Sequence, residues 1–290
     1  MVKPRSLGCS GRGSVHDQNR DSFMTNLIYQ NYKELFGCNE ELRKMVDGVM
    51  NKEFHKITPK VALTTFVLGK AYKTHGAILF LCAQGYGEDA AILTRSLFDL
   101  SITLLYILKD PTNKRVLRYF RYDSIIRKKM FDYAKDVPTF AKLFKERELH
   151  PKPGDTTLKE VEKYAKLAQG KYNYGRMGWS DKPIRQMAEE VGREGAYQTV
   201  YYLQSNITHS TVRTMNDYVK AHDKGYTVDI GRGESWVQED LVASFDFFLA
   251  IVERSNKLLR LGIAKQLNSL SKRYLGKVGR VNKKAGKLDL

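Results

Sequence analysis

Apolar residues recur at intervals of three and four along most of the chain, a spacing that predicts amphipathic helices. The longest such stretches run over residues 59–84, 88–109 and 234–261. The short turn 85–87 joins the first two, so we expect them to pack as an antiparallel hairpin. Alternating apolar residues indicate one small β-hairpin near residues 226–236. The predicted fold class is therefore all-α, a multi-helix bundle with that hairpin as its only β-structure.

The rest of the pattern divides the chain into one helical domain and two tails. Further helices are expected over residues 19–52 with a break near Gly37, 113–135, 139–147, 158–168, 182–191 and 195–222. Residues 1–18 are polar and glycine-rich, which is typical of a flexible tail. Beyond residue 265 the chain is basic and loses its periodicity. We therefore predict a single all-α domain over residues 19–265 and a basic tail over residues 266–290.

One face of the predicted helix 195–222 carries a row of polar side chains. Side chains four residues apart lie one above another on the same side of an α-helix. The row consists of Tyr197, Tyr201, Ser205 and His209. Such a row of hydroxyl groups with an imidazole at its end either forms hydrogen bonds within a core or lines a site. The sequence leaves both interpretations open.

The helix 88–109 is apolar around nearly its whole circumference, which indicates burial. Arg95 and Asp99 are therefore expected in or beside the core, where a lone charge is costly. They are four residues apart and can pair, and Glu88 lies two turns earlier on nearly the same face. Because an arginine that precedes its acid is the less favourable order, we expect a third group, such as His209, to complete the arrangement. The alternative is a structural network that sets the helix register.

Charge adds a candidate partner to this picture. The net charge is +17, an excess that favours polyanions such as RNA or DNA through non-specific electrostatics. Basic residues interleaved with aromatic residues on the helix 113–135, and others near the C-terminus, are candidate phosphate contacts; the alternative is a solvated helix face and a loose basic end. The candidates are Arg118, Arg121, Lys272, Arg273, Lys283 and Lys284.

Several classes of site are disfavoured by the sequence. Three widely spaced cysteines form no CxxC pair, which argues against a disulfide scaffold or a thiolate zinc site and suits a reducing, cytoplasmic location. The scattered histidines form no metal motif, so neither a metal nor a cofactor is expected. The segment 85–90 matches a dinucleotide fingerprint but follows a helix, so we reject it. Charges interrupt both apolar segments that could cross a membrane, and the first residues lack a signal-peptide pattern, so no membrane association is expected.

The polar residues of the two helices also resemble a known pattern. Glu88-Asp89-Ala90 and Arg95-x-x-x-Asp99, followed by Trp179 and the row from Tyr197 to His209, resemble a family of uncharacterised bacterial all-helical proteins. The similarity covers roughly residues 61–217. The motifs are moderately specific as a set, and the resemblance implies an all-helical fold without assigning an activity.

At the level of architecture the chain is also similar to HEPN domains, helical bundles that often cleave RNA without metal in toxin and phage-defence settings. Those ribonucleases carry an arginine, four to six residues and then a histidine on one helix. No arginine here has a histidine at that spacing, so an equivalent site needs Arg95 and His209 from two helices. In that case His209 takes a 2′-hydroxyl proton, Arg95 stabilises the charged transition state, and Ser205 orients the imidazole, with Asp99 and Tyr201 in support.

The expected function is therefore that of a nucleic-acid-associated bacterial protein that cleaves RNA without metal. Two other classes stay open. One is a non-enzymatic scaffold or sensor with a structural polar network. The other is a helical protein that binds a small ligand, with Glu88 and Tyr197 among its contacts. A homo-oligomer is compatible with each of them.

Overall fold

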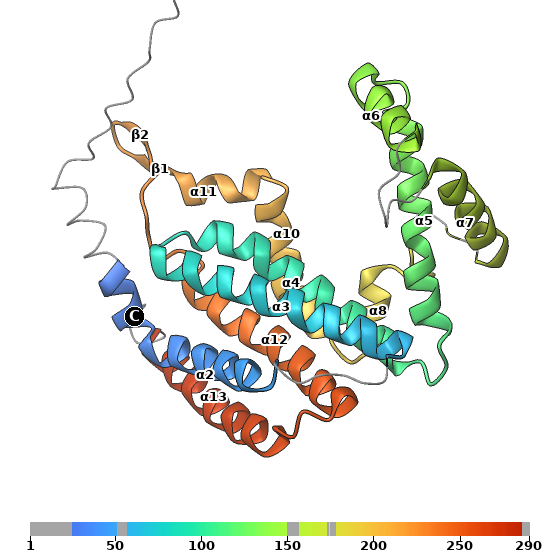
Figure 1. The fold of residues 1–290 in the computed structure, drawn as a ribbon. Coiled ribbons are helices and arrows are strands. Elements are labelled where there is room, and N and C mark those ends of the chain that lie inside the picture. The colour runs from blue at the N-terminus through green and yellow to red at the C-terminus, as the bar shows by residue number, and fades with distance from the viewer. Residues whose placement is uncertain (1–24, 51–56, 150–156, 173, 175–177, 286–290) are drawn as a thin grey trace, which may run out of the picture.

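The computed structural model describes residues 25–50, 57–149, 157–172, 174 and 178–285, and it confirms the all-α prediction (Figure 1). The only sheet in this part of the chain is a two-stranded antiparallel hairpin. In chain order the longer helices are α2 (Lys33–Met50), α3 (Pro59–Gln84), α4 (Gly87–Lys109), α5 (Lys114–Ala134), α6 (Pro138–Leu149), α7 (Leu158–Lys171), α12 (Val237–Leu259) and α13 (Ala264–Ala285).

Helices α3 and α4 form the predicted antiparallel hairpin (Figure 1). Pro59 occupies the first turn of α3 behind the N-cap Thr58, whose side chain accepts from the Val61 amide. Gly85 ends α3 with φ +77°, a conformation that glycine adopts without penalty. A Cβ atom on Gly87 would lie 1.8 Å from the Ser235 carbonyl oxygen, so this glycine lets the chain before α12 cross the turn closely.

Helix α12 is the centre of the body. It packs on α3 and α4 at one side and on α2 and α13 at the other (Figure 1). Its apolar side chains, including Phe245, Phe248 and Val252, are almost completely buried. Burial of one such side chain contributes roughly 1.5–3 kcal/mol, so this helix supplies a large part of the hydrophobic stabilisation.

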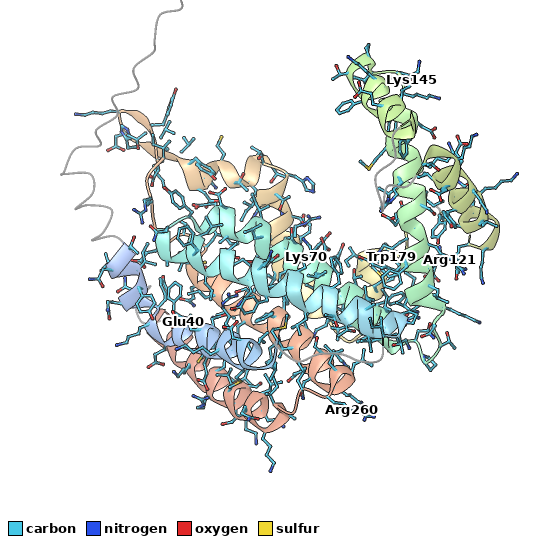
Figure 2. All side chains as sticks on the ribbon, viewed as in Figure 1. Glu40, Lys70, Arg121, Lys145, Trp179 and Arg260 are labelled. Carbon is cyan, nitrogen blue, oxygen red and sulfur yellow. The ribbon has the colours of Figure 1, made fainter. Side chains whose placement is uncertain are left out.

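Helices α5, α6 and α7 form an arm that projects from the body (Figure 1). The arm has a small core of its own, made by Ile125, Ala165 and Ala168. Figure 2 shows Lys145 near the tip of the arm and Trp179 near its base. Trp179 packs edge-on against Tyr119 at 5.1 Å, and this contact joins the arm to the body.

The predicted single helix 195–222 is wrong, because the structure breaks it into short pieces. They are α9 (Glu194–Ala196), the π-helix η1 (Tyr197–Tyr201), α10 (Tyr202–Thr208), the 3-10 helix η2 (Val212–Thr214) and α11 (Met215–Tyr218). The regular helix ends where polar side chains bond to the backbone. Thr208 donates to the Gln204 carbonyl at 2.9 Å, Asn206 donates to the Tyr202 carbonyl at 2.9 Å, and Ser210 then has φ +47°.

The hairpin exists but lies earlier than the alternation suggested. Strand β1 (Val219–His222) pairs with β2 (Gly225–Val228), so the turn falls at residues 223–224 rather than in the glycine-rich segment after residue 230. Short helix α8 (Ile184–Glu190) matches the prediction for residues 182–191.

Two further expectations about helix limits are wrong. Helix α2 runs through Gly37, which is exposed and has no neighbour near its Cβ position, so glycine here does not interrupt the helix. Residues 264–285 form α13 rather than an aperiodic tail. Leu267, Leu270 and Tyr274 are buried at spacings of three and four, and this stripe holds α13 against α2 and α12. Residues 1–18 lie outside the described residues.

Candidate functional site

The structure brings Arg95 of α4 against two residues of the polar row. The Arg95 Nε atom donates to the Ser205 Oγ atom at 2.9 Å, and its Nη2 atom donates to the Tyr201 hydroxyl at 3.0 Å. The guanidinium carbon lies 4.9 Å from the centre of the Tyr201 ring. All three side chains are partly buried. Together with Asp99, which lies one turn further along α4, we call this group the Arg95 centre.

A π-helical turn presents the tyrosines to α4. Within η1 the rings of Tyr197 and Tyr201 stack at 4.8 Å, with planes 20° apart. Phe98 of α4 packs 5.1 Å from the Tyr201 ring and so helps to hold this ring in place. Single π-helical turns inside α-helices occur frequently at functional sites, where they redirect side chains. Tyr197 therefore takes part in the centre through Tyr201 and not through a described bond to Arg95.

Asp99 does not form the expected ion pair with Arg95 among the described residues, because the guanidinium extends toward α10 instead. Burial raises the pKa of Asp99 from 3.8 to about 6, although the nearby Arg95 charge opposes part of this change. Burial, followed by the Asp99 charge, also raises the pKa of Tyr201. A carboxyl group that titrates near neutral pH is suited to acid–base chemistry.

His209 lies at the end of this row. It caps α10, and its amide donates to the Ser205 carbonyl at 3.0 Å, so it stands one turn beyond Ser205. Its side chain is exposed. In the described part of the chain no contact joins His209 to Arg95, and the contacts from Arg95 to the polar row are those to Tyr201 and Ser205.

Glu88 lies at the start of α4, away from the other candidates. It is partly buried, and burial, followed by the charges of Asp217 and Asp89, raises its pKa. No contact between Glu88 and Arg95 is present among the described residues. Its surroundings are acidic, so Glu88 does not extend the Arg95 centre.

A second buried carboxyl group was missed in the sequence. Asp240 of α12 is fully buried, and its Oδ1 atom accepts from the Gln204 Nε2 atom at 2.9 Å. Burial raises its pKa well above the ordinary value and so favours the neutral form of the carboxyl group. The Asp240 Oδ2 and Gln204 Oε1 atoms have no described hydrogen-bond partner. The available signal was an acid on the apolar face of α12, directly before the buried Leu241.

The basic candidates occupy two surfaces. Arg118 is engaged within the arm, since its Nε atom donates to the Trp179 carbonyl at 2.6 Å. Arg121 lies on the arm (Figure 2), where it lines a groove of about 600 Å³ between α5 and α7. The groove is lined by Phe120, Arg121, Arg127, Tyr164, Leu167 and Lys171, among others. On α13, Lys272 is exposed and Arg273 pairs with Glu41 at 2.6 Å, while the side chains of Lys283 and Lys284 lie outside the described residues.

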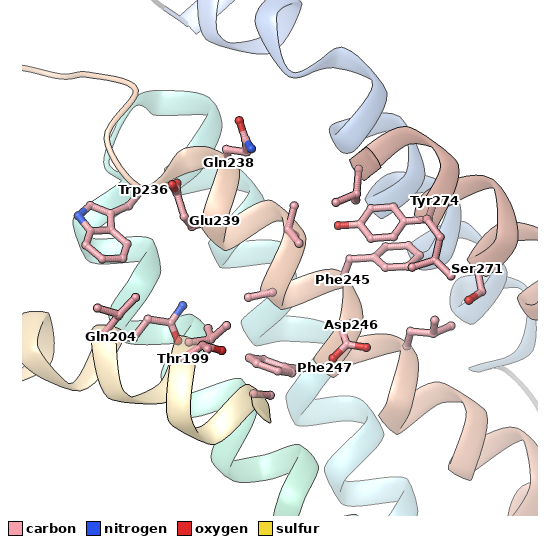
Figure 3. Close-up of a pocket in the computed structure, with 18 residues that line it drawn as sticks. Thr199, Gln204, Trp236, Gln238, Glu239, Phe245, Asp246, Phe247, Ser271 and Tyr274 are labelled. Atoms are coloured by element: carbon pink, nitrogen blue, oxygen red, sulfur yellow. The ribbon is translucent and has the colours of Figure 1, made fainter. Parts of the chain in front are cut away.

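A separate cavity of about 560 Å³ lies between η1, α10, α12 and α13 (Figure 3). Its walls are mainly apolar and include Phe245, Phe247 and Tyr274. Thr199 and Leu203 line it from a different side of the η1–α10 segment than the one that meets Arg95. The cavity is therefore distinct from the Arg95 centre.

The described residues hold no group of three or more histidine, cysteine, aspartate or glutamate side chains suited to a metal ion. Cys38 and Cys82 are buried free thiols, and Cys9 lies outside the described residues. Burial raises the pKa of Cys82, so this thiol is a poor nucleophile. Helix α4 alone, in the described part of the chain, is long and apolar enough to cross a membrane, and more than half of its most apolar window is buried within the protein.

A family model, described as a family of unknown function (DUF5677), matches residues 61–226, which is more than half of the chain. The chain belongs to this family. The match contains the Arg95 centre, His209 and the whole arm, and it ends before α12 and α13. No curated protein and no solved structure matches the chain. None of these comparisons shows a similarity to HEPN domains.

Proposed function

We propose that this DUF5677 protein binds RNA and cleaves it without metal at the Arg95 centre. The observation that carries the proposal is the guanidinium of Arg95, held between the Ser205 and Tyr201 hydroxyl oxygens, next to a carboxyl group with a pKa of about 6. This combination supplies a fixed positive charge for a phosphate and a base for a hydroxyl proton. The proposed site shares the arginine with the HEPN-like arrangement considered from the sequence, but Asp99 replaces His209 as the base.

The proposed reaction is an attack of the ribose 2′-oxygen on the adjacent phosphorus. Asp99 takes the 2′-hydroxyl proton while the new bond from oxygen to phosphorus forms. The bond from phosphorus to the 5′-oxygen breaks, and that oxygen takes a proton from His209 in its charged form. Arg95 stabilises the additional negative charge of the transition state, and such donors contribute on the order of 10²–10³ in rate. The products are a 2′,3′-cyclic phosphate and a 5′-hydroxyl end.

The arm supports the binding step of this proposal. Helix α5 carries seven basic and two acidic side chains, and aromatic side chains stand between them. Phe120 and Tyr164 beside Arg121 combine ring faces with positive charge, as sites for single-stranded nucleic acid do. RNA bound there is expected to dissociate as salt rises, because its phosphates release counterions when they meet lysine and arginine.

Arg95→Ala tests the proposal directly. The full chain, purified and assayed with end-labelled RNA in excess EDTA, is expected to cut RNA, and Arg95→Ala to slow this at least about 100-fold. Arg185→Ala is the matched control, since Arg185 is exposed on α8 and its one ion pair among the described residues is with Glu189. An RNA with a 2′-deoxy sugar at the cleaved position should resist. Equal cleavage by Arg95→Ala and the normal chain contradicts the assignment.

The competing function is a non-enzymatic scaffold or sensor, in which the Arg95 centre only fixes α10 on α4. On that alternative Arg95→Ala lowers the melting temperature, and RNA stays intact with every variant. Measurements of the melting temperature and of RNA cleavage on the same protein samples therefore distinguish the two functions.

A further inference from the structure

We propose that the cavity between η1, α10, α12 and α13 binds a small cationic amphiphile, with an apolar body and an ammonium-type head. This site goes beyond RNA cleavage, because none of the described residues that line the cavity belongs to the Arg95 centre. Its volume of about 560 Å³ lies within the range of ligand pockets. Its polar and apolar groups are also unevenly distributed, and that distribution selects the class of ligand.

The charge of the lining separates this cavity from the rest of the protein. The chain carries a net charge of +17, yet none of the described lining residues is a lysine, arginine or histidine. The lining includes two carboxylates, Glu239 and Asp246. Asp246 pairs with Arg193 at 2.5 Å, whereas Glu239 is exposed and has no ion pair among the described residues. The cavity therefore disfavours anions and leaves one carboxylate available to a cation.

Trp236 and Glu239 form the proposed site for the head group. Trp236 is the N-cap residue of α12 and Glu239 lies in the first turn of that helix, and both side chains line the cavity. In Figure 3 Trp236, Glu239 and Gln204 lie toward one end of the cavity, and Tyr274 and Ser271 lie toward the other. An indole face beside a carboxylate is a favourable environment for an ammonium group, through cation–π attraction and charge.

The backbone of Trp236 gives a second reason to regard this end as a binding site. Its φ is +65°, a left-handed conformation that is unfavourable for a residue with a Cβ atom. The close crossing at Gly87 and the hydrogen bond from the Gly233 amide to the Gly85 carbonyl at 3.0 Å hold this segment in place. Strained residues of this kind concentrate at ligand clamps.

The other end of the cavity suits an apolar body. Phe245 of α12 stacks on Tyr274 of α13 at 3.7 Å, and Phe247, Val242 and Leu249 continue the apolar wall. At the end that holds Trp236 and Glu239, Gln204 adds one polar group, since it is 1 % exposed, lines the cavity, and has an Oε1 atom without a described partner. A donor on the ligand can satisfy this oxygen, which a purely apolar molecule leaves unpaired.

The test compares three probes that share one apolar body: decylamine, decanol and decanoate. The chain has two tryptophans, so Trp179→Phe leaves Trp236 as the single tryptophan, at the proposed site. Below the critical micelle concentration, decylamine is expected to change Trp236 emission and to bind at least about tenfold more tightly than decanol. Decanoate is expected to bind most weakly.

Two variants distinguish the proposal from non-specific uptake of an amphiphile. Glu239→Gln should remove the advantage of decylamine over decanol and leave decanol binding unchanged, while Glu162→Gln on the exposed face of α7 should alter neither. Val242→Phe should fill the cavity and weaken both probes when binding is followed by calorimetry. Equal affinities for the three probes, a preference for decanoate, or no saturable binding would each overturn the proposal.

Discussion

His75 and the Arg95 centre are two polar groups within the same helical body, and their surroundings give them different chemistry. His75 is completely buried, with its ring stacked 4.5 Å from Phe248. Its Nε2 atom lies 2.8 Å from the Asn39 Oδ1 atom. Because the Asn39 amide donates to the carbonyls of Leu35 and Leu241, Oδ1 is its acceptor and Nε2 carries the histidine proton.

Burial shifts the pKa values of His75 and Asp99 in opposite directions, and the two groups differ in reactivity as a result. Burial, with a smaller effect of the Arg43 charge, lowers the pKa of His75 to about 3, so the ring is neutral at neutral pH. Burial raises the pKa of Asp99 to about 6, so this group changes charge near neutral pH. A closed pair fixes helices together, whereas a partly exposed acid beside an arginine can exchange protons with a ligand.

The largest expected effect on stability belongs to the closed pair. Asn39→Ala removes the acceptor of His75 and the donor to two carbonyl groups, all inside the core. Unfolding in urea should show a loss of about 3 kcal/mol in the free energy of unfolding. Gln198→Ala, which removes an exposed amide bonded to Glu194, is the control and should change it by less than about 0.5 kcal/mol. A loss as small as that of the control contradicts a structural role for Asn39.

Asp99→Asn is expected to raise the free energy of unfolding, and by less than Asn39→Ala lowers it. A folded pKa raised from 3.8 to about 6 means that the folded state holds the proton more tightly, so stability is complete at low pH and falls as pH rises through about 6. At pH 7 the neutral asparagine should therefore stabilise the protein, by about 1–2 kcal/mol after allowance for partial exposure. The gain should shrink as the pH is lowered toward 4.

The same variant tests the proposed chemistry. Cleavage of RNA by the normal chain should rise as the pH increases through about 6, and Asp99→Asn should remove both the activity and this rise. Asp223→Asn, at an exposed position in the turn between β1 and β2, is the matched control and should alter neither stability nor cleavage. If the variant is more stable but still cuts RNA at the normal rate, the raised pKa of Asp99 is supported and its role as the base is contradicted.

Part of this arrangement could be predicted from sequence because local rules decide it. The lengths of α3 and α4 follow from apolar periodicity, Pro59 and Gly85, and the structure agrees with them. The contact of Arg95 with Tyr201 and Ser205 follows from a charge on a buried helix that needs partners and a row that offers them. In both cases one strong local preference agrees with the fold.

The errors arose where two preferences compete. At the end of α10, helix periodicity continues past Thr208, but the side chains of Thr208 and Asn206 bond to the backbone and the helix stops. In α13 the many basic residues hid the buried stripe that includes Leu270. Asp240 was overlooked because an acid in the first turn of a helix is ordinarily explained by the helix dipole. Tertiary burial decides such cases, and the sequence pattern does not show it.

The smallest expected effect on folding belongs to His209. Its side chain is exposed and makes no described contact with the Arg95 centre, so His209→Ala should change the free energy of unfolding by less than about 0.5 kcal/mol. The proposed reaction nevertheless uses His209 as the proton donor, and a lost acid typically lowers the rate about 100-fold or more. Urea unfolding and RNA cleavage on one preparation measure both quantities. Unchanged stability together with slow cleavage would support His209 as the proton donor. If cleavage instead proceeds at the normal rate, solvent protonates the leaving oxygen and the site reduces to Arg95, Asp99 and their hydroxyl partners.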